Sequence, residues 1–170
     1  MVKCGTFLYF YKVKYSWMKN LVGTYDCKVD SKGRVMMPAS LNNQILESDF
    51  VIKRSVFNHC LELYPVSEWD HMMNQVNKLN RFVKKNNDFI RSYLSGLRSL
   101  KLDHSGRFLI PKDLVVFASI NKDVVLTASV NMVEIWNKDE YEQTVKETLV
   151  DFASLAEEVM GNKSTNEDVS

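Results

Sequence analysis

Two pairs of charged residues repeat in this sequence with the same internal spacing. Asp30 and Arg34 lie four positions apart in the phrase KVDSKGRVMMPASL. Asp103 and Arg107 lie four positions apart in the phrase KLDHSGRFLIPKDL. Arginine stays charged and cannot shuttle protons, so these pairs do not indicate acid–base catalysis. A guanidinium group can instead hold a phosphate or read the O6 and N7 atoms of guanine.

The pairs also have a purely structural interpretation. Each aspartate can accept backbone N–H groups of its turn and close that turn as an ion pair with its arginine. We favour this role for the aspartates, whereas the arginines stand where strands would project them outward. Three lysines beside the pairs add a basic edge. The predicted DNA-binding residues are Lys28, Asp30, Lys32, Arg34, Lys101, Asp103 and Arg107.

Other chemistry is not indicated by the sequence. The motifs of phosphate-binding loops, dinucleotide sites, zinc proteases and nucleophile elbows are absent. The three histidines have no partners at metal-ligand spacing, and the three cysteines include no CxxC pair. We therefore expect no enzymatic activity, no metal and no cofactor. The cysteine pattern favours a reduced, cytoplasmic chain.

Glycine and proline residues mark the structure of the repeated phrase. Gly33 and Gly106 can adopt the positive φ that a tight reversal requires. Pro38 and Pro111 are expected to end the following strands and to begin short helices. Each half of the chain is thus predicted to contain a strand, a tight turn, a strand and a short helix. A β-hairpin and a longer helix follow in each half.

The repeat extends beyond the phrase. The offset is 73 residues from Asp30 to Asp103, and residues 50–69 correspond to residues 123–141. We expect the offset to slip to 72 in the hairpin turn, as a one-residue deletion would cause. Further helices are predicted near 66–80 and 86–97, and a single long acidic helix over 138–160. The apolar stripes on the helices near 66–80 and 86–97 are candidates for subunit contacts or for covering their own barrel.

The charge distribution suggests how the chain is organised. Residues 71–120 carry nine basic and three acidic residues, whereas residues 121–170 carry four basic and eleven acidic residues. A basic face toward a polyanion and an acidic tail are therefore expected. No stretch is long and apolar enough to predict a membrane span. The predicted divisions are an N-terminal extension (1–20), a first repeat (21–80), a linking helix (81–95), a second repeat (96–148) and an acidic helix with a disordered tail (149–170).

These phrases, together with LELYPVSEW and VEIWNKDEY after the hairpins, resemble the MraZ family of bacterial transcriptional regulators. The resemblance covers about residues 21–148. It implies an α+β fold of two AbrB-like (SpoVT-AbrB) swapped-hairpin repeats that form an interleaved small β-barrel with flanking helices. It also implies a ring-like homo-oligomer, associated with the nucleoid, that binds double-stranded DNA at short direct repeats. These repeats would lie upstream of its own operon, the division and cell-wall gene cluster, which it would repress.

The resemblance assigns DNA contact to Asp30, Arg34, Asp103 and Arg107. The second copy departs from the first at His104 and Ser105, where the equivalent of Lys32 is missing. Two other classes of protein remain open. An AbrB-like antitoxin or transition-state regulator would bind DNA through the same fold, and the long C-terminal helix leaves room for a toxin. A pure assembly module would use the apolar helices and bind no DNA.

Overall fold

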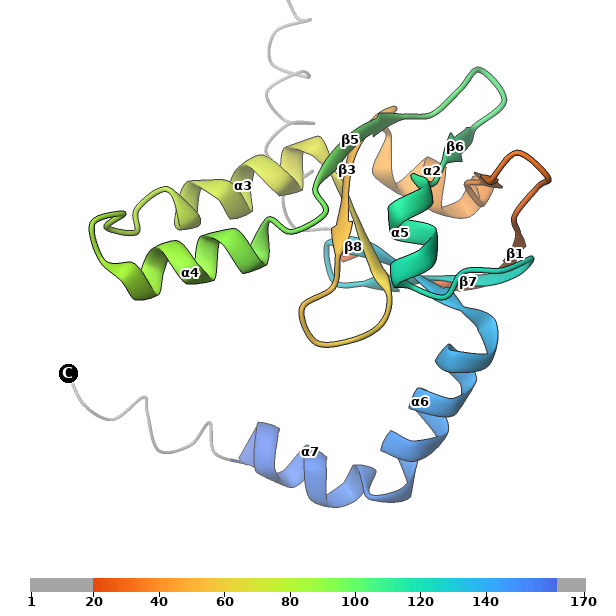
Figure 1. Cartoon of the computed structure of the whole chain (residues 1–170). Coiled ribbons are helices and arrows are strands. Elements are labelled where there is room, and N and C mark those ends of the chain that lie inside the picture. Colours follow the sequence, from red (N-terminus) through yellow and green to blue (C-terminus); the bar gives the residue numbers. More distant parts are fainter. Residues whose placement is uncertain (1–19, 162–170) are drawn as a thin grey trace, which may run out of the picture. The chain divides into compact units, whose positions relative to one another are not determined.

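The computed structural model describes residues 20–161, and the predictions for 1–19 and for the tail after 161 lie outside this range (Figure 1). Within residues 20–161, the first half contains four strands and three helices, and the second half repeats that order. The elements are β1 (Thr24–Lys28), β2 (Arg34–Met36), α2 (Ala39–Ile45), β3 (Asp49–Arg54), β4 (Leu61–Pro65), α3 (Val66–Val76), α4 (Lys84–Tyr93), β5 (Arg98–Lys101), β6 (Arg107–Leu109), α5 (Lys112–Phe117), β7 (Asp123–Ser129), β8 (Met132–Asn137), α6 (Lys138–Val150) and α7 (Phe152–Gly161).

The strands of the two halves are interleaved. A six-stranded sheet has the order β1-β7-β8-β4-β3-β5, and β2 pairs with β6 in a separate two-stranded ribbon. All of these pairs are antiparallel. The first strand of each half therefore pairs with the hairpin of the other half. The mixed α+β class is confirmed.

The six-stranded sheet is open rather than closed. Within residues 20–161, β1 and β5 are its two edges and do not pair with each other, so the expected closed barrel is not found. The sheet is instead covered on one face by the β2–β6 ribbon and by α2 and α5 (Figure 1). This cover buries one face of the sheet, as closing the sheet into a barrel would also have done.

One hydrophobic core serves both halves. It lies between the six-stranded sheet and the ribbon, where Val35 of β2 and Phe108 of β6 are opposite each other and almost fully buried. Leu41 of α2 and Leu114 of α5 enter the same core and are fully buried. Because each half supplies about half of this apolar surface, neither half has a complete core of its own.

The other face of the sheet is covered in the first half by the α3–α4 hairpin. Trp69 packs edge-on against Tyr64 of β4 and stacks on Tyr93 of α4, with ring centroids 5.6 and 6.2 Å apart. Met73 packs against the same cluster. The apolar stripe predicted on residues 66–80 thus covers part of its own chain, which is the second of the two roles expected for it. The helix predicted next is present as α4, ending at Tyr93.

The two hairpins differ in length by more than the sequence suggested. By strand register, Phe50 pairs with Leu100 and is equivalent to Val124, which pairs with Cys27, an offset of 74 residues. After the turns, Leu61 is equivalent to Val133, an offset of 72. The expected one-residue deletion is therefore wrong, and the second loop is two residues shorter. Alternating apolar residues made both alignments plausible from the sequence.

Residues 138–161 form a separate unit. The single helix predicted there is wrong, because α6 ends at Val150 and α7 begins at Phe152. Exposed apolar side chains are present on α7, among them Phe152, Val159 and Met160. Among residues 20–161, no helix has the length and apolar character needed to cross a membrane.

Candidate nucleic-acid interface

The first Asp–Arg pair closes the turn between β1 and β2. Asp30 Oδ1 accepts the backbone N–H groups of Lys32 (2.8 Å) and Arg34 (2.9 Å). Its Oδ2 accepts Arg34 Nε at 2.8 Å and lies 2.7 Å from Nη2. Gly33 occupies the required positive φ of 81° and donates its N–H to the Asp30 carbonyl. The predicted clasp and the predicted glycine geometry are both present here.

The second turn repeats this geometry between β5 and β6. Asp103 Oδ1 accepts the N–H groups of Ser105 (2.8 Å) and Arg107 (3.0 Å), and Oδ2 accepts Arg107 Nε at 3.0 Å. Gly106 has φ of 74° and donates to the Asp103 carbonyl. Both turns lie on the same side of the sheet in Figure 1. Pro38 and Pro111 stand at the starts of α2 and α5, as predicted.

The hydrogen bonds hold both aspartates in their charged form. The backbone N–H of Arg34, then its guanidinium, lowers the pKa of Asp30 to about 2, and the N–H of Lys32 acts in the same direction. The backbone N–H of Arg107 is the largest cause that lowers the pKa of Asp103. Both ion pairs are thus intact at neutral pH, and they fix the direction of the guanidinium groups.

The register of the ribbon places the two arginines on one face. Arg34 pairs with Leu109, and Met36 pairs with Arg107. Arg34 and Arg107 are therefore diagonal neighbours, about 7–8 Å apart at the backbone. Since side chains alternate along a strand, both point away from the face that carries the buried Val35. We call the four outward residues, Arg34, Met36, Arg107 and Leu109, the ribbon face.

Each guanidinium is held along one side only. Asp30 contacts Nε and Nη2 of Arg34, which is a side-on arrangement. A guanidinium has five N–H donors, so the end formed by Nη1 and Nη2 keeps donors that face away from the carboxylate. Among the described residues, Arg34 and Arg107 have no further side-chain partner beyond their own aspartates. That end is the part of arginine that fits guanine or phosphate.

The three predicted lysines differ in their surroundings. Lys32 is exposed in the first turn, and Ser105 takes the corresponding place in the second turn. Lys101 lies 3.5 Å from Asp49, its partner in the β5–β3 register. Lys28 is exposed and lies opposite Asp123 in the β1–β7 register. An acidic neighbour offsets part of the charge of Lys28 and Lys101, so Lys32 is the lysine with the strongest case for phosphate contact.

Sequence reasoning missed two residues of the ribbon face. Met36 and Leu109 are 50% and 56% exposed, and neither was among the predicted DNA-binding residues. A signal in the sequence could have found them. In each of the strands RVM and RFL, side chains alternate between the two faces, so the third residue lies on the same face as the arginine. The ribbon packs on the core through Val35 and Phe108 only, so its other face is open to solvent.

The described residues offer neither a metal site nor an activated thiol. No group of three or more His, Cys, Asp or Glu side chains is arranged to hold a metal ion within residues 20–161. Burial is the main cause that raises the pKa of the Cys60 thiol, to about 12, and that of Cys27 is also raised by burial. Both thiols are therefore protonated at neutral pH and are poor nucleophiles.

Comparison with known proteins gives one consistent match. The family model described as "MraZ protein, putative antitoxin-like" matches this chain twice, over residues 21–92 and 93–162. The Transcriptional regulator MraZ of Flavobacterium psychrophilum is 60% identical over 153 residues, covering 88% of this chain and 98% of that protein.

More distant relatives carry the same name. The Transcriptional regulator MraZ of Christiangramia forsetii is 57% identical over 148 residues, covering 85% of this chain and 96% of its own length. That of Pediococcus pentosaceus is 36% identical over 139 residues, covering 82% of this chain and 96% of its own length. Two tandem matches that span residues 21–162, with relatives of this identity, leave one assignment: the chain belongs to the MraZ family of transcriptional regulators and is not an enzyme.

Proposed function

We propose that this chain is a sequence-specific DNA-binding regulator that contacts DNA through the ribbon face. The observation that carries the proposal is the placement of Arg34 and Arg107 on one side of a two-stranded ribbon, each oriented by its own aspartate. A two-stranded β-ribbon fits the major groove of B-DNA, which is about 12 Å wide. Arginine is the side chain that most often reads guanine there.

The aspartates are orienting residues in this proposal. Negative charge near DNA is unfavourable by itself, so a carboxylate beside each arginine needs a reason. Side-on pairing restricts the guanidinium to few rotamers and leaves its end free for a base, which reduces the entropy lost on binding. Lys32 adds a phosphate contact beside the first turn, whereas Ser105 gives the second turn none. The two turns would therefore make unequal contributions.

We further propose that the chain acts as a ring-like homo-oligomer on short direct repeats upstream of its own operon, and that it represses the division and cell-wall gene cluster located there. The interleaved strands support the AbrB-like swapped-hairpin arrangement that the resemblance implies. One ribbon spans only a few base pairs. Joining several ribbons makes later contacts intramolecular and raises the overall affinity.

A shift assay with the DNA upstream of the chain's own gene tests the proposal. The wild type should bind this DNA more tightly than unrelated DNA of the same length, with an affinity that falls steeply as salt rises. Arg34→Ala and Arg107→Ala should each weaken binding by about 1–3 kcal/mol. Lys84→Ala, an exposed cation on α4 paired with Asp88, is the matched control and should bind like the wild type.

Both arginine variants are expected to remain folded, because their side chains lie outside the core; thermal melts check this. Equal binding by Arg34→Ala, Arg107→Ala and the wild type would reject the ribbon face as the DNA site. Loss of folding in both variants would mean that the clasps are structural only.

A second candidate function is an AbrB-like antitoxin or transition-state regulator. The exposed apolar residues of α7 favour it, because an amphipathic helix is a common way to bind a groove of another protein. Co-expression with the product of each neighbouring gene, followed by a growth assay, separates the two functions. Relief of toxicity by the full chain, and its loss on truncation after Val150, would favour the antitoxin.

A further inference from the structure

We propose that Met36 and Leu109 recognise the C5-methyl groups of thymine, at base pairs next to those contacted by the arginines. This inference rests on the proposed DNA-binding function and adds a determinant of specificity to it. Among the described residues, these are the two apolar side chains of the ribbon face, and each is half exposed. The thymine methyl is the apolar group that the major groove presents.

The position of each side chain is set by the opposite strand. Met36 stands directly across from Arg107, and Leu109 stands directly across from Arg34. Side chains opposite each other in an antiparallel pair have Cβ atoms about 4.5–5.5 Å apart. An arginine that enters the groove therefore brings an apolar side chain with it.

The glycines of the turns keep these side chains accessible. A Cβ placed on Gly106 would meet Met36 Sδ at 3.9 Å, and a Cβ placed on Gly33 would meet Leu109 Cδ1 at 3.6 Å. Met36 thus lies over the glycine of the second turn, and Leu109 over the glycine of the first. A Cβ at either position would contact one of these apolar side chains, so glycine leaves more of Met36 and Leu109 exposed.

The free energy of desolvation favours an apolar contact for Met36 and Leu109 over a polar one. A charged and wet surface surrounds them, so burying Met36 or Leu109 against a polar base edge would leave that edge without a hydrogen bond and would cost affinity. Against a thymine methyl, both partners lose apolar surface to each other. Burying one methyl group is worth about fourfold in affinity. Two contacted thymines would therefore give up to about fifteenfold.

The test compares two forms of the same DNA. The DNA upstream of the chain's own gene is prepared with thymine or with uracil, which lacks the methyl group and pairs identically. The wild type should bind the thymine form about four- to fifteenfold more tightly. Met36→Ser with Leu109→Ser should bind both forms equally. Val116→Ser, which changes a 79% exposed apolar residue on α5, should keep the wild-type ratio.

Each outcome has one meaning. Equal affinity of the wild type for both forms overturns the proposal without any variant. A double variant that keeps the full wild-type ratio also overturns it, because the methyl would then act through DNA shape. If the wild type binds the upstream DNA no better than unrelated DNA, the proposed function itself fails. A preference for upstream DNA that ignores the methyl removes only the roles of Met36 and Leu109.

Discussion

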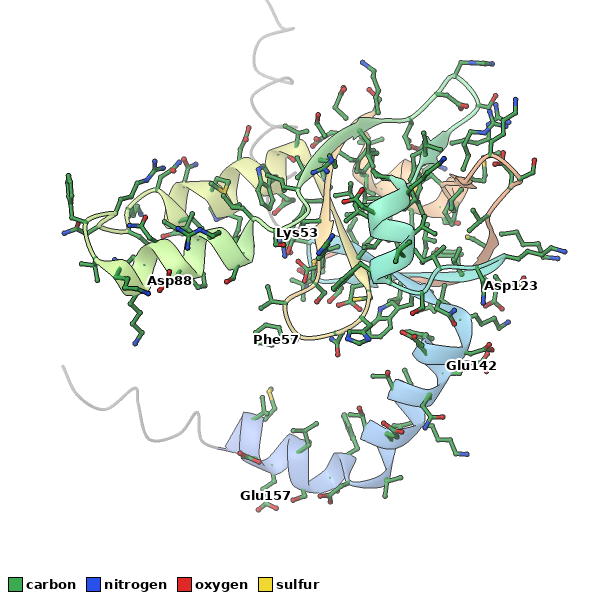
Figure 2. All side chains as sticks on the ribbon, in the orientation of Figure 1. Lys53, Phe57, Asp88, Asp123, Glu142 and Glu157 are labelled. Carbon is green, nitrogen blue, oxygen red and sulfur yellow. The ribbon has the colours of Figure 1, made fainter. Side chains whose placement is uncertain are left out.

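Glu62 and Glu134 lie directly opposite each other where β4 pairs with β8. They occupy equivalent positions in the two halves but have different partners. Glu62 lies 2.7 Å from Lys53 Nζ and accepts the Tyr64 hydroxyl at 3.0 Å. Glu134 accepts the indole N–H of Trp136 at 2.8 Å. Lys53, labelled in Figure 2, is fully buried and also donates to the Arg54 carbonyl, so the cation that balances Glu62 is itself shielded from solvent.

Removing that cation should destabilise the fold strongly. Lys53→Met keeps an unbranched side chain of similar length but leaves Glu62 buried without an opposite charge, at an expected cost of about 3–5 kcal/mol of unfolding free energy. Urea denaturation measures this. Lys53→Met with Glu62→Gln should recover most of the loss, and Lys84→Met, at an exposed ion pair, should cost less than about 1 kcal/mol. A small effect of Lys53→Met alone would contradict this account.

The two turn aspartates should make the stability of the fold depend on pH in the acidic range. The pKa of Asp30 is about 2 in the folded chain, below the value of about 3.9 expected when unfolded. A lowered folded-state pKa gives stability that is complete above about pH 4 and is lost as the pH falls toward 2. Asp30→Asn should flatten this dependence, and Asp30→Asn with Asp103→Asn should flatten it further. Thermal melts between pH 2 and 7 measure the effect, and an unchanged slope in the double variant would refute it.

The Asp30→Ala variant separates two effects of Asp30 on DNA affinity, namely its negative charge and its role in orienting Arg34. If net charge alone governed DNA binding, removing a carboxylate would raise the affinity. Because Asp30 holds Arg34 side-on, we expect the opposite, a loss of about tenfold. Asp123→Ala, an acidic residue that lies opposite Lys28, is the matched control and should raise affinity or leave it unchanged. Binding is measured by fluorescence anisotropy, and tighter binding by Asp30→Ala would argue against an orienting role.

Separated halves of the chain should need each other. Residues 20–95 contain β1 without its partner β7, and residues 96–161 contain β5 without its partner β3. Neither piece should fold as a monomer, and mixing them in equal amounts should restore cooperative unfolding, followed by circular dichroism. A monomeric first half with a sharp thermal transition would show that the interleaving is not required.

Oligomer state and operator spacing should be coupled. We expect a homo-oligomer that binds two or three direct repeats much more tightly than one. Moving one repeat by half a helical turn, about 5 base pairs, should reduce affinity sharply, because the second site then faces the other side of the duplex. Light scattering gives the mass, and shift assays give the affinities. A monomer that binds one repeat as well as three would exclude this mode of binding.

Much of the local structure could be predicted because it depends on nearby residues. Gly33 and Gly106 reverse the chain within four residues of their aspartates, and Pro38 and Pro111 stand at helix starts. Those features follow from backbone conformation alone. The break between α6 and α7 was not predictable in this way, since the residues around Asp151 include no glycine or proline.

The long-range relationships were harder to predict. Pairing of β1 with β7 depends on contacts between segments about a hundred residues apart, and a repeat in sequence is equally compatible with two separate units. The burial of Lys53 was missed for a similar reason. Its partner Glu62 lies on the next strand, and its cover, the ring of Tyr93 at 4.5 Å, comes from a helix after the repeat. Placing Arg34 and Arg107 on the same face of the ribbon also required knowledge of the β2–β6 register.

The exchange of first strands also sets a sequence of events during synthesis. Thr24 on β1 hydrogen-bonds through its hydroxyl to Thr127 on β7, which is translated 103 residues later. At about 5–20 residues per second, the ribosome needs about 5–20 s to supply that partner. The ribbon likewise lacks one strand until Arg107–Leu109 has emerged. A nascent chain therefore lacks the complete ribbon face, the proposed DNA-binding surface, until translation is nearly finished.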